Sequence, residues 1–302
     1  MTFVAVDWGT SALRGARMAA DGRVLEERSA PRGILTVPAG GFPAVFDELF
    51  GDWMHEPGAT CLISGMAGSR QGWVEAPYCA CPADAADVAR HILEIEPGRV
   101  AMVPGLSDQH QGVPDVMRGE EVQIFGAMAL TGLDSGLFVL PGTHNKWVRV
   151  QQGRAQGFHT FMTGEFYALL SQHSILARTL DAQAPLDETA FVQGVQRVRQ
   201  HPGGLLHHAF GARTLALFHQ MPEASLASYL SGLLIGEELN AQTLNAEDTV
   251  VLVGGAALTQ RYALALQTLR IPTCTLGAEA TWAGAYALHS ARQAASAAES
   301  AA

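Results

Sequence analysis

The stretch FVAVDWGTSALRGARM, residues 3–18, is the part of the sequence that says most about the fold. An apolar run ends in the turn-like Asp7-Trp8-Gly9-Thr10, and a second strand pattern follows from Ala12 to Met18. Asp21-Gly22 turns the chain again before a third strand pattern at Arg23 to Glu27. The sequence therefore predicts an antiparallel meander whose first hairpin tip consists of small and polar residues.

A related pattern recurs in the second half of the chain. Leu137 to Leu140 is apolar, Pro141-Gly142-Thr143-His144 turns, and strand patterns follow at residues 146–151 and 155–160. We interpret the recurrence as an internal duplication, with one hairpin unit in each of two lobes at 1–132 and 133–302. Chance resemblance between two glycine-tipped hairpins is the alternative at this point.

The remaining patterns alternate between strands and helices, which favours an α/β fold. Further strands are expected at Thr60–Ser64, Val100–Val103 and Thr249–Val253. Helices are expected at Ala44–Trp53, Pro82–Ile95, Glu120–Leu130, Gly164–Gln172, Glu188–Gln200, Glu223–Leu244, Ala257–Leu269 and Ala280–Arg292.

Composition narrows the function classes. Hydrophobic residues make up 48% and charged residues 16% of the 302 positions, which indicates a packed protein of two domains. The formal net charge of −10 disfavours nucleic acid and anionic membranes as partners. No apolar run approaches the ~20 residues that span a bilayer, so we expect a cytoplasmic protein. Four scattered cysteines lack the paired ligands that a structural zinc site needs.

The two hairpin tips suit a polyphosphate ligand. Glycine lets the backbone N–H groups approach phosphate closely, and Thr10, Ser11 and Thr143 add hydroxyl donors. Asp7, at the end of an apolar strand, could hold Mg²⁺, and the alternative is an Asx-turn residue that satisfies its own backbone. Gly254-Gly255 joins a strand to a helix N-terminus, which suits an anion or serves only as a tight connection.

Five segments in this order resemble the 2-dehydro-3-deoxygalactonokinases, a family of the actin and hexokinase superfamily. They are DWGTSALR (7–14), GMAGSRQGW (65–73) followed by APY (76–78), VPDVMRGEE (113–121), LPGTHNKW (140–147) and MTGEFYALL (162–170). The resemblance covers almost the whole chain, and it favours the duplication over chance.

The resemblance implies a two-lobed ribonuclease-H-like fold of the actin and hexokinase type, with ATP, Mg²⁺ and a sugar acid in an interlobe cleft. Asp7, Gly9, Thr10 and Ser11 match the first phosphate loop, Gly142 and Thr143 the second, and Gly254 and Gly255 the adenosine loop. The second loop of the superfamily usually opens with Asp, where this chain has Leu140. His144, Asn145 or Lys146 is expected to supply the missing polar contact.

The segment at residues 65–73 is the candidate substrate loop, with Ser69, Arg70 and Gln71 between glycines. Arg70 suits the carboxylate of the acceptor, because a guanidinium offers two parallel N–H groups, and the alternative is a surface arginine. The remaining candidate contacts each have a plainer interpretation as well. Trp73 and Tyr78 wall the pocket or belong to the core, Arg14 reaches phosphate or acceptor, and Glu165 contacts substrate or only begins a helix.

In the superfamily that the chain resembles, the general base is a carboxylate of the first lobe near the end of a strand or the start of a helix. Glu120 and Glu121 fit that place, since they open a predicted helix directly after Gly119. Glu120 is favoured, because adjacent helical residues point about 100° apart and only one can face the substrate. The alternative is that these are helix-start residues, with Asp108 and Asp115 next in line as base.

The expected reaction is transfer of the γ-phosphoryl group of ATP to the terminal hydroxyl of 2-dehydro-3-deoxy-D-galactonate. A kinase for the epimeric 2-dehydro-3-deoxygluconate and a non-catalytic nucleotide-binding regulatory protein are the alternatives. Apolar helices such as Leu226 to Leu239 suit packing against a second copy in a homodimer as well as inside the second lobe.

Overall fold

The computed structural model describes residues 2–245 and 248–301, which pack into two compact units. Each unit draws on separate stretches of the chain. Unit 1 comprises Met1–Gly136, Val148–His159 and Leu276–Ala302, and unit 2 comprises Leu137–Trp147 and Thr160–Thr275. The lobe boundaries expected from the sequence stay a prediction.

The first sheet contains the predicted meander. Its strands are β1 (Phe3–Trp8), β2 (Leu13–Met18), β3 (Val24–Ala30), β4 (Thr60–Ser64), β6 (Leu93–Glu96) and β7 (Val100–Met102). They lie in the order β3-β2-β1-β4-β7-β6, with β1 antiparallel to β2 and parallel to β4. The C-terminal ends of β1 and β4 therefore lie next to each other, directly before the first predicted phosphate loop and the predicted substrate loop.

The second sheet repeats this order. Its strands are β10 (Gly136–Leu140), β11 (Asn145–Gln151), β12 (Arg154–Phe161), β13 (Val250–Val253) and β14 (Thr273–Leu276). They lie in the order β12-β11-β10-β13-β14, which is the order β3-β2-β1-β4-β7 of the first sheet with each strand replaced by its counterpart. In both sheets the first strand of the meander, β1 or β10, pairs in parallel with the first strand that follows the meander along the chain, β4 or β13. The duplication predicted from the sequence is confirmed.

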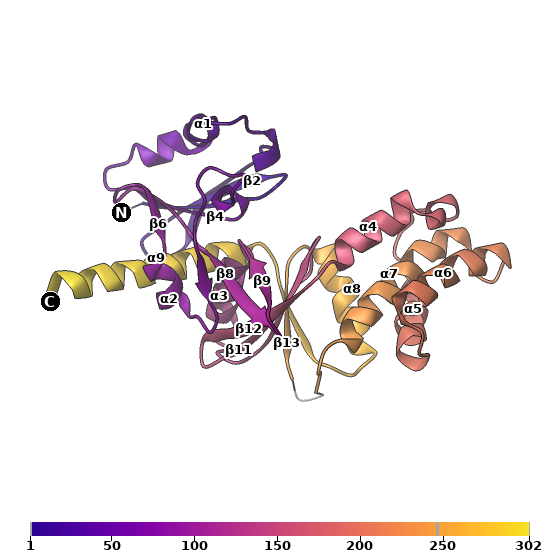
Figure 1. Cartoon of the computed structure of the whole chain (residues 1–302). Helices are drawn as coiled ribbons and strands as arrows, with labels where there is room; N and C mark the ends of the chain where they lie inside the picture. The colour runs from indigo at the N-terminus through magenta and orange to yellow at the C-terminus, as the bar shows by residue number, and fades with distance from the viewer. Residues whose placement is uncertain (1, 246–247, 302) are drawn as a thin grey trace. The chain divides into compact units, whose positions relative to one another are not determined.

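Helices α3 and α9 pack closely in unit 1 (Figure 1). A Cβ atom at Gly126 would lie 1.7 Å from the carbonyl oxygen of Ala280, and one at Gly284 would lie 1.8 Å from that of Val122, so only glycine permits this contact. The helices of unit 1 are α1 (Phe42–Met54), α2 (Ala85–Arg90), α3 (Glu120–Thr131) and α9 (Glu279–Ala301), with short 3-10 turns at Ile34–Thr36 and Met66–Gly68.

Unit 2 is mainly helical outside its strands, and α7 lies at its centre (Figure 1). Its helices are α4 (Thr163–His173), α5 (Glu188–Gln200), α6 (Gly204–Leu217), α7 (Glu223–Asn240) and α8 (Ala256–Gln267), with a 3-10 turn at Ile175–Arg178. From Leu226 to Gly236 every residue of α7 is buried, and α5 and α6 pack against it. The apolar helix therefore packs inside the unit, which is one of the two alternatives that the sequence left open, the other being packing against a second copy.

The helix expected at Pro82–Ile95 is wrong in its second half. A capping box of Asp84 and Asp87 starts α2, but the helix ends at Arg90 because Leu93–Glu96 pairs with β7 as an edge strand of the first sheet. The sequence analysis also missed α6 and a small sheet of β5 (Tyr78–Ala80), β8 (Gly105–His110) and β9 (Val113–Met117). No helix in the part of the chain that the structure describes is long and apolar enough to cross a bilayer.

Candidate active site

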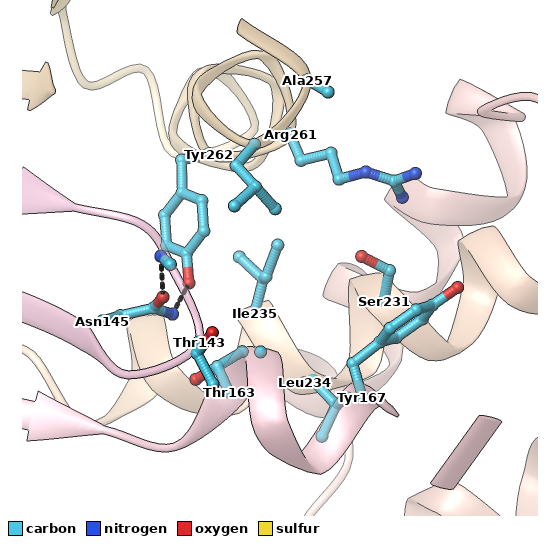
Figure 2. Close-up of a pocket in the computed structure, with 13 residues that line it drawn as sticks. Thr143, Asn145, Thr163, Tyr167, Ser231, Leu234, Ile235, Ala257, Arg261 and Tyr262 are labelled. Atoms are coloured by element: carbon cyan, nitrogen blue, oxygen red, sulfur yellow. Dashed lines mark hydrogen bonds between the residues drawn. The ribbon is translucent and has the colours of Figure 1, made fainter. Parts of the chain in front are cut away.

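A cavity of about 370 Å³ opens in unit 2 (Figure 2). One end is polar and the other is apolar with an arginine above it. The lining comprises Gly142, Thr143, Asn145, Thr163, Gly164, Tyr167, Ser231, Leu234, Ile235, Ala257, Leu258, Arg261 and Tyr262. The size suits a small ligand, and the mixture of apolar walls with a few polar groups is typical of a ligand site.

Two predicted glycine loops lie at one edge of the second sheet, because β10 and β13 are parallel neighbours and their C-terminal ends share that edge; of the two, Gly142 and Thr143 are among the described lining of the cavity and Gly254 and Gly255 are not. Gly142 and Thr143 follow β10, and Gly254 and Gly255 follow β13. Gly254 has φ +151°, and a Cβ atom there would lie 3.4 Å from the carbonyl oxygen of Pro141. The predicted second phosphate loop and the predicted adenosine loop therefore lie side by side.

The N-terminus of α4 closes the polar end of the cavity. The Glu165 N–H donates to the carbonyl oxygen of Thr143 at 3.0 Å. A Cβ atom at Gly164 would lie 2.1 Å from the carbonyl oxygen of Gly142, so the loop can approach the helix only because residue 164 is glycine. The helix dipole at this end favours an anion.

His144, Lys146 and Glu165 were all expected at the site. His144 Nε2 and Glu165 Oε2 lie 2.5 Å apart on half-exposed side chains, so the structure brings these two predicted residues together. Lys146 does not point to solvent: it is buried, and its Nζ donates to Thr160 Oγ1 at 2.8 Å. Among the described residues that line the cavity, neither His144 nor Lys146 appears.

Tyr167 and Arg261 line the far end of the cavity and were missed by the sequence analysis. Figure 2 shows the Arg261 side chain extending from α8 over the cavity, with Leu234 and Ile235 of α7 below it. A guanidinium above an apolar floor suits a flat aromatic base. No sequence motif marks this end of the cavity, because its side chains come from α4, α7 and α8, which are three separate segments of the chain.

The first phosphate loop, Gly9–Ser11, is held by the segment that follows the meander. The Gly9 carbonyl accepts from the Ile34 N–H at 3.0 Å, and a Cβ atom at Gly33 would lie 2.2 Å from the carbonyl oxygen of Thr10. Thr10 and Ser11 are exposed at the tip. These two residues are therefore presented to solvent on a fixed support.

Asp7 lies directly opposite Arg14 in the β1–β2 register, and the two side chains form a hydrogen-bonded ion pair. The Asp7 carboxylate therefore does more than complete an Asx-turn with its own backbone, because it also pairs with Arg14. Residues 2–245 and 248–301 contain no group of three or more His, Cys, Asp or Glu side chains that could hold a metal. A single carboxylate still fits Mg²⁺, since this ion commonly takes one or two carboxylates with phosphate oxygens and water.

The start of α3 approaches the end of β1 through two glycines. A Cβ atom at Gly119, where φ is +104°, would lie 3.1 Å from Gly65 Cα. One at Gly65 would lie 3.1 Å from Asp7 Oδ1. The start of α3, where Glu120 lies, therefore approaches the end of β1, where Asp7 lies.

Glu120 and Glu121 differ in their surroundings. Glu120 is half-buried, and its Oε2 accepts from the Arg118 N–H at 3.0 Å. Glu121 is fully buried; its Oε2 accepts from the Gly119 N–H at 2.7 Å, and its Oε1 has no partner among the described residues. Burial, helped by the charge of Glu120, raises the pKa of Glu121 to about 8. Glu120 is the one of the two that solvent reaches.

The alternative bases lie on the hairpin of β8 and β9, where Asp108 and Asp115 face each other across the register. Asp108 Oδ2 accepts from the Phe158 N–H at 2.9 Å and lies 3.1 Å from His110 Nε2. Asp108 is therefore already engaged in holding β12.

The substrate loop places its polar residues outward and its tryptophan inward. Arg70 is 87% exposed, and its Nε lies 3.7 Å from Glu75 Oε1; Gln71 is exposed and Ser69 is half-buried. Trp73 instead packs against Trp8 and Phe46 in the core of unit 1. Trp73 is thus part of the packing of the core, which was the alternative to a role as a wall of the substrate pocket.

Arg118 holds the end of this loop and was not singled out from the sequence. Its guanidinium is buried, lies 4.4 Å over the ring of the 43%-exposed Tyr78, and donates from Nη2 to the carbonyl oxygen of Ala76 at 2.8 Å. Because Arg118 immediately precedes α3, it ties the substrate loop to the helix that carries Glu120.

Comparison with known proteins decides the family. The model of the 2-keto-3-deoxy-galactonokinase family matches residues 7–288. The chain belongs to this family. A curated 2-dehydro-3-deoxygalactonokinase of Escherichia coli K12 is 34% identical over 269 residues, which cover 88% of this chain and 90% of that protein. The chain is thus an enzyme of phosphoryl transfer, and a non-catalytic regulatory protein is set aside.

Solved structures agree on the fold. A crystal structure from Sinorhizobium meliloti, provisionally assigned as a 2-dehydro-3-deoxygalactonokinase, superposes with a TM-score of 0.85 at 36% identity and covers 97% of this chain and 99% of its own. Component A of the Acidaminococcus fermentans (R)-2-hydroxyglutaryl-CoA dehydratase has a TM-score of 0.54 at 11% identity, covering 98% of this chain and 99% of its own. The two-lobed α/β fold class expected from the sequence is confirmed.

We predict that Arg70→Ala raises the KM for the sugar acid by about 10-fold or more while the KM for ATP stays near that of the parent, since a charge-assisted hydrogen bond contributes ~1.5–3 kcal/mol. Initial rates with each substrate varied in turn measure both constants. Arg99→Ala is the matched control, because Arg99 is also exposed and paired, at 3.3 Å, with Glu96. Equal rises in both KM values would remove Arg70 from the acceptor site.

Glu121 makes the stability of the protein depend on pH. The unfolded carboxyl loses its proton near pH 4.5 and the folded one only near pH 8, so the unfolding free energy falls as the pH rises through this window. Glu121→Gln carries no such proton and should flatten the dependence. Thermal melts at intervals across the window measure it; a fall as steep in the variant as in the parent would show that Glu121 is not the group responsible.

Proposed function

We propose that this chain transfers the γ-phosphoryl group of ATP to the terminal hydroxyl of 2-dehydro-3-deoxy-D-galactonate, as a step of galactonate breakdown. The observation that carries the proposal is the cavity of unit 2, which is lined by the Gly142–Thr143 loop, the start of α4 and the start of α8. Membership of the family supplies the substrate class, a sugar acid, and the terminal hydroxyl comes from the resemblance.

The nucleotide belongs in this cavity. The Gly142–Thr143 loop would bind phosphate oxygens through the Thr143 N–H and hydroxyl, with the Gly142 N–H held by Asn145 Oδ1, and Gly254 and Gly255 would lie against the adenosine. The apolar end of the cavity below Arg261 suits the base. His144 and Glu165 form a polar pair beside the loop and stay in the proposal as contacts to phosphate and substrate respectively.

The first phosphate loop would hold the metal end of the nucleotide. Asp7 is the proposed ligand of Mg²⁺, with Gly9, Thr10 and Ser11 contacting phosphate oxygens. Mg²⁺, when bound, neutralises charge on the phosphate oxygens during the transfer. Arg14 keeps the Asp7 carboxylate in one orientation through their ion pair, and its half-exposed guanidinium is available to phosphate or acceptor.

Glu120 is the proposed general base. As the acceptor oxygen forms its bond to the γ-phosphorus, the Glu120 carboxylate accepts the hydroxyl proton, and the bond from the γ-phosphorus to the β–γ bridging oxygen breaks to release ADP. The hydrogen bond from the Arg118 N–H to Glu120 Oε2 fixes the direction of the carboxylate. Ser69, Arg70 and Gln71 would bind the acceptor, with Arg70 on its carboxylate and Tyr78 at the wall of its site.

The product identifies the reaction. The purified protein is incubated with MgATP and 2-dehydro-3-deoxy-D-galactonate, and the position of the phosphoester is read by phosphorus-coupled NMR; the terminal carbon is expected. Kinetics with the gluconate epimer, which differs in the direction of one hydroxyl, test the assignment: a higher kcat/KM for the epimer would replace the proposed acceptor. A cytoplasmic location, a homodimer and the absence of nucleic-acid or membrane partners stay predictions.

A further inference from the structure

Glu238 is a fully buried carboxylate of α7 that no sequence pattern pointed to. It is 2% exposed and accepts four side-chain hydrogen bonds. Tyr262 Oη donates at 2.6 Å and Asn145 Nδ2 at 2.8 Å to Oε2, Thr163 Oγ1 also donates to Oε2, and Trp147 Nε1 donates to Oε1. These donors come from β11, the start of α4 and the middle of α8, so one carboxylate joins four elements around the cavity.

A carboxylate in this place is costly for the fold. Burial raises the pKa of Glu238, and the four hydrogen bonds act in the opposite direction. Apolar residues of similar volume commonly replace buried charged groups with no loss of stability, so core packing does not require an acid here. The presence of a carboxylate at this position is explained better by the orientation that it imposes on the four side chains that donate hydrogen bonds to it.

Asn145 connects the carboxylate to the second phosphate loop. Its Nδ2 donates to Glu238 and to Tyr262 Oη, and its Oδ1 accepts from the Gly142 N–H at 2.6 Å. Figure 2 shows the Asn145 amide beside the Tyr262 hydroxyl, with a dashed line for the hydrogen bond between them. Since a carboxylate only accepts hydrogen bonds, it orients the amide nitrogen of Asn145 toward itself and thereby directs the amide oxygen to the loop.

The loop has no acidic residue of its own between Leu140 and Lys146. Its backbone is instead tied at Gly142 through Asn145, while Thr163, at the start of α4, is tied to the same carboxylate oxygen. Both groups line the cavity. Glu238 therefore lies behind the polar end of the cavity, and its donors form the surface that a ligand meets.

We propose that Glu238 is a positioning residue for the nucleotide. It holds Asn145, and through it the Gly142–Thr143 loop, together with Thr163 and Tyr262, in the arrangement that receives the phosphates. The proposal rests on the proposed function in one respect, namely that the ligand of this cavity is an adenine nucleotide. A preformed loop binds without paying the entropy of ordering, so a loosened loop should cost nucleotide affinity more than affinity for the acceptor.

The test is direct binding of ADP and ATP, by calorimetry without sugar acid, to the parent and to Glu238→Gln. Glutamine keeps the shape but replaces one accepting oxygen by an NH₂ group that only donates, so at least one of the four donors loses its acceptor and the network that orients Asn145 is weakened. We expect nucleotide dissociation constants about 10–100-fold higher, as for other losses of orienting contacts. In steady-state kinetics the KM for ATP should rise by a similar factor while the KM for the sugar acid stays within about twofold.

Two further variants separate positioning from simple stability. Val195→Ala removes two methyl groups from a fully buried side chain of the same unit, and should lower the melting temperature without changing nucleotide binding. Trp147→Phe removes one donor to Glu238 from a residue that is not among the described lining of the cavity, and should weaken nucleotide binding in the same direction as Glu238→Gln. If Glu238→Gln does not fold, Trp147→Phe decides.

The outcomes are distinct. Nucleotide binding by Glu238→Gln as tight as in the parent, at a temperature where both are folded, would overturn the positioning role. Equal weakening in Val195→Ala would overturn it too, because any loosening of the core would then have the same effect. Failure of the parent itself to bind ADP or ATP would instead count against the proposed function.

Discussion

Replacing Glu120 by glutamine is expected to lower kcat by about 10²–10⁴-fold, the usual contribution of a general base, while nucleotide affinity stays close to that of the parent. The amide has the same shape but cannot take the acceptor proton. Glu120 is half-buried at the start of α3, next to the glycines that bring this helix to the end of β1. Rates at saturating MgATP and sugar acid, with ADP binding measured separately, give both quantities.

Two variants control for the plainer interpretation of Glu120 as a helix-start carboxylate. Glu121→Gln should change kcat little, because the Glu121 side chain is fully buried and keeps its proton up to about pH 8. Glu223→Gln removes a carboxylate from the first turn of α7 and should also leave kcat unchanged. A large loss at Glu121 alone would transfer the role of base to it, and small losses at both would move the base to Asp108 or Asp115.

Asp7→Asn is expected to keep the fold and to lower turnover by at least ~10²-fold, since a metal ligand contributes several kcal/mol to charge stabilisation in the transition state. The amide is isosteric and can still meet Arg14 through its oxygen. A circular dichroism melt should therefore stay close to that of the parent. The rate is measured over a series of Mg²⁺ concentrations.

Asp21→Asn provides the matched control at the far turn of the same meander, where Asp21 Oδ1 accepts from the Arg23 N–H at 3.1 Å. It should behave like the parent at every Mg²⁺ concentration. Near-normal turnover of Asp7→Asn at saturating Mg²⁺ would contradict the catalytic requirement for Asp7.

The fold was predictable where local signals decide it. Each meander is specified by apolar strands with turn residues between them, so both hairpin units and the helices α1, α3 and α5 lie where the patterns placed them, within a few residues. The segment Leu93–Glu96 could not be assigned, because its pairing with β7 is a tertiary contact that overrides a helical pattern. Helix α6 lacks a distinct apolar face and a side-chain cap, so its sequence carries no clear helical signal.

The residues of the candidate site also fall into those that local sequence motifs predict and those that only tertiary contacts reveal. The glycine loops could be found because short motifs specify them, and the structure brings Gly142–Thr143 and Gly254–Gly255 together at one sheet edge. Glu238 and Arg261 could not be found, since each stands alone in an ordinary helical pattern and acquires its meaning only from partners far along the chain. Lys146 shows the converse: its place beside the loop suggested a ligand contact, but alternation along β11 turns it inward to Thr160.

The most direct test of the central claim is ADP release by the purified protein in MgATP, with and without 2-dehydro-3-deoxy-D-galactonate, and with Asp7→Asn as a blank for contaminating kinases. The account predicts that the sugar acid raises the initial rate far above the rate in its absence, to a limit set by enzyme concentration, and that the blank shows little of this increase. A rate that is the same with and without the sugar acid would contradict it.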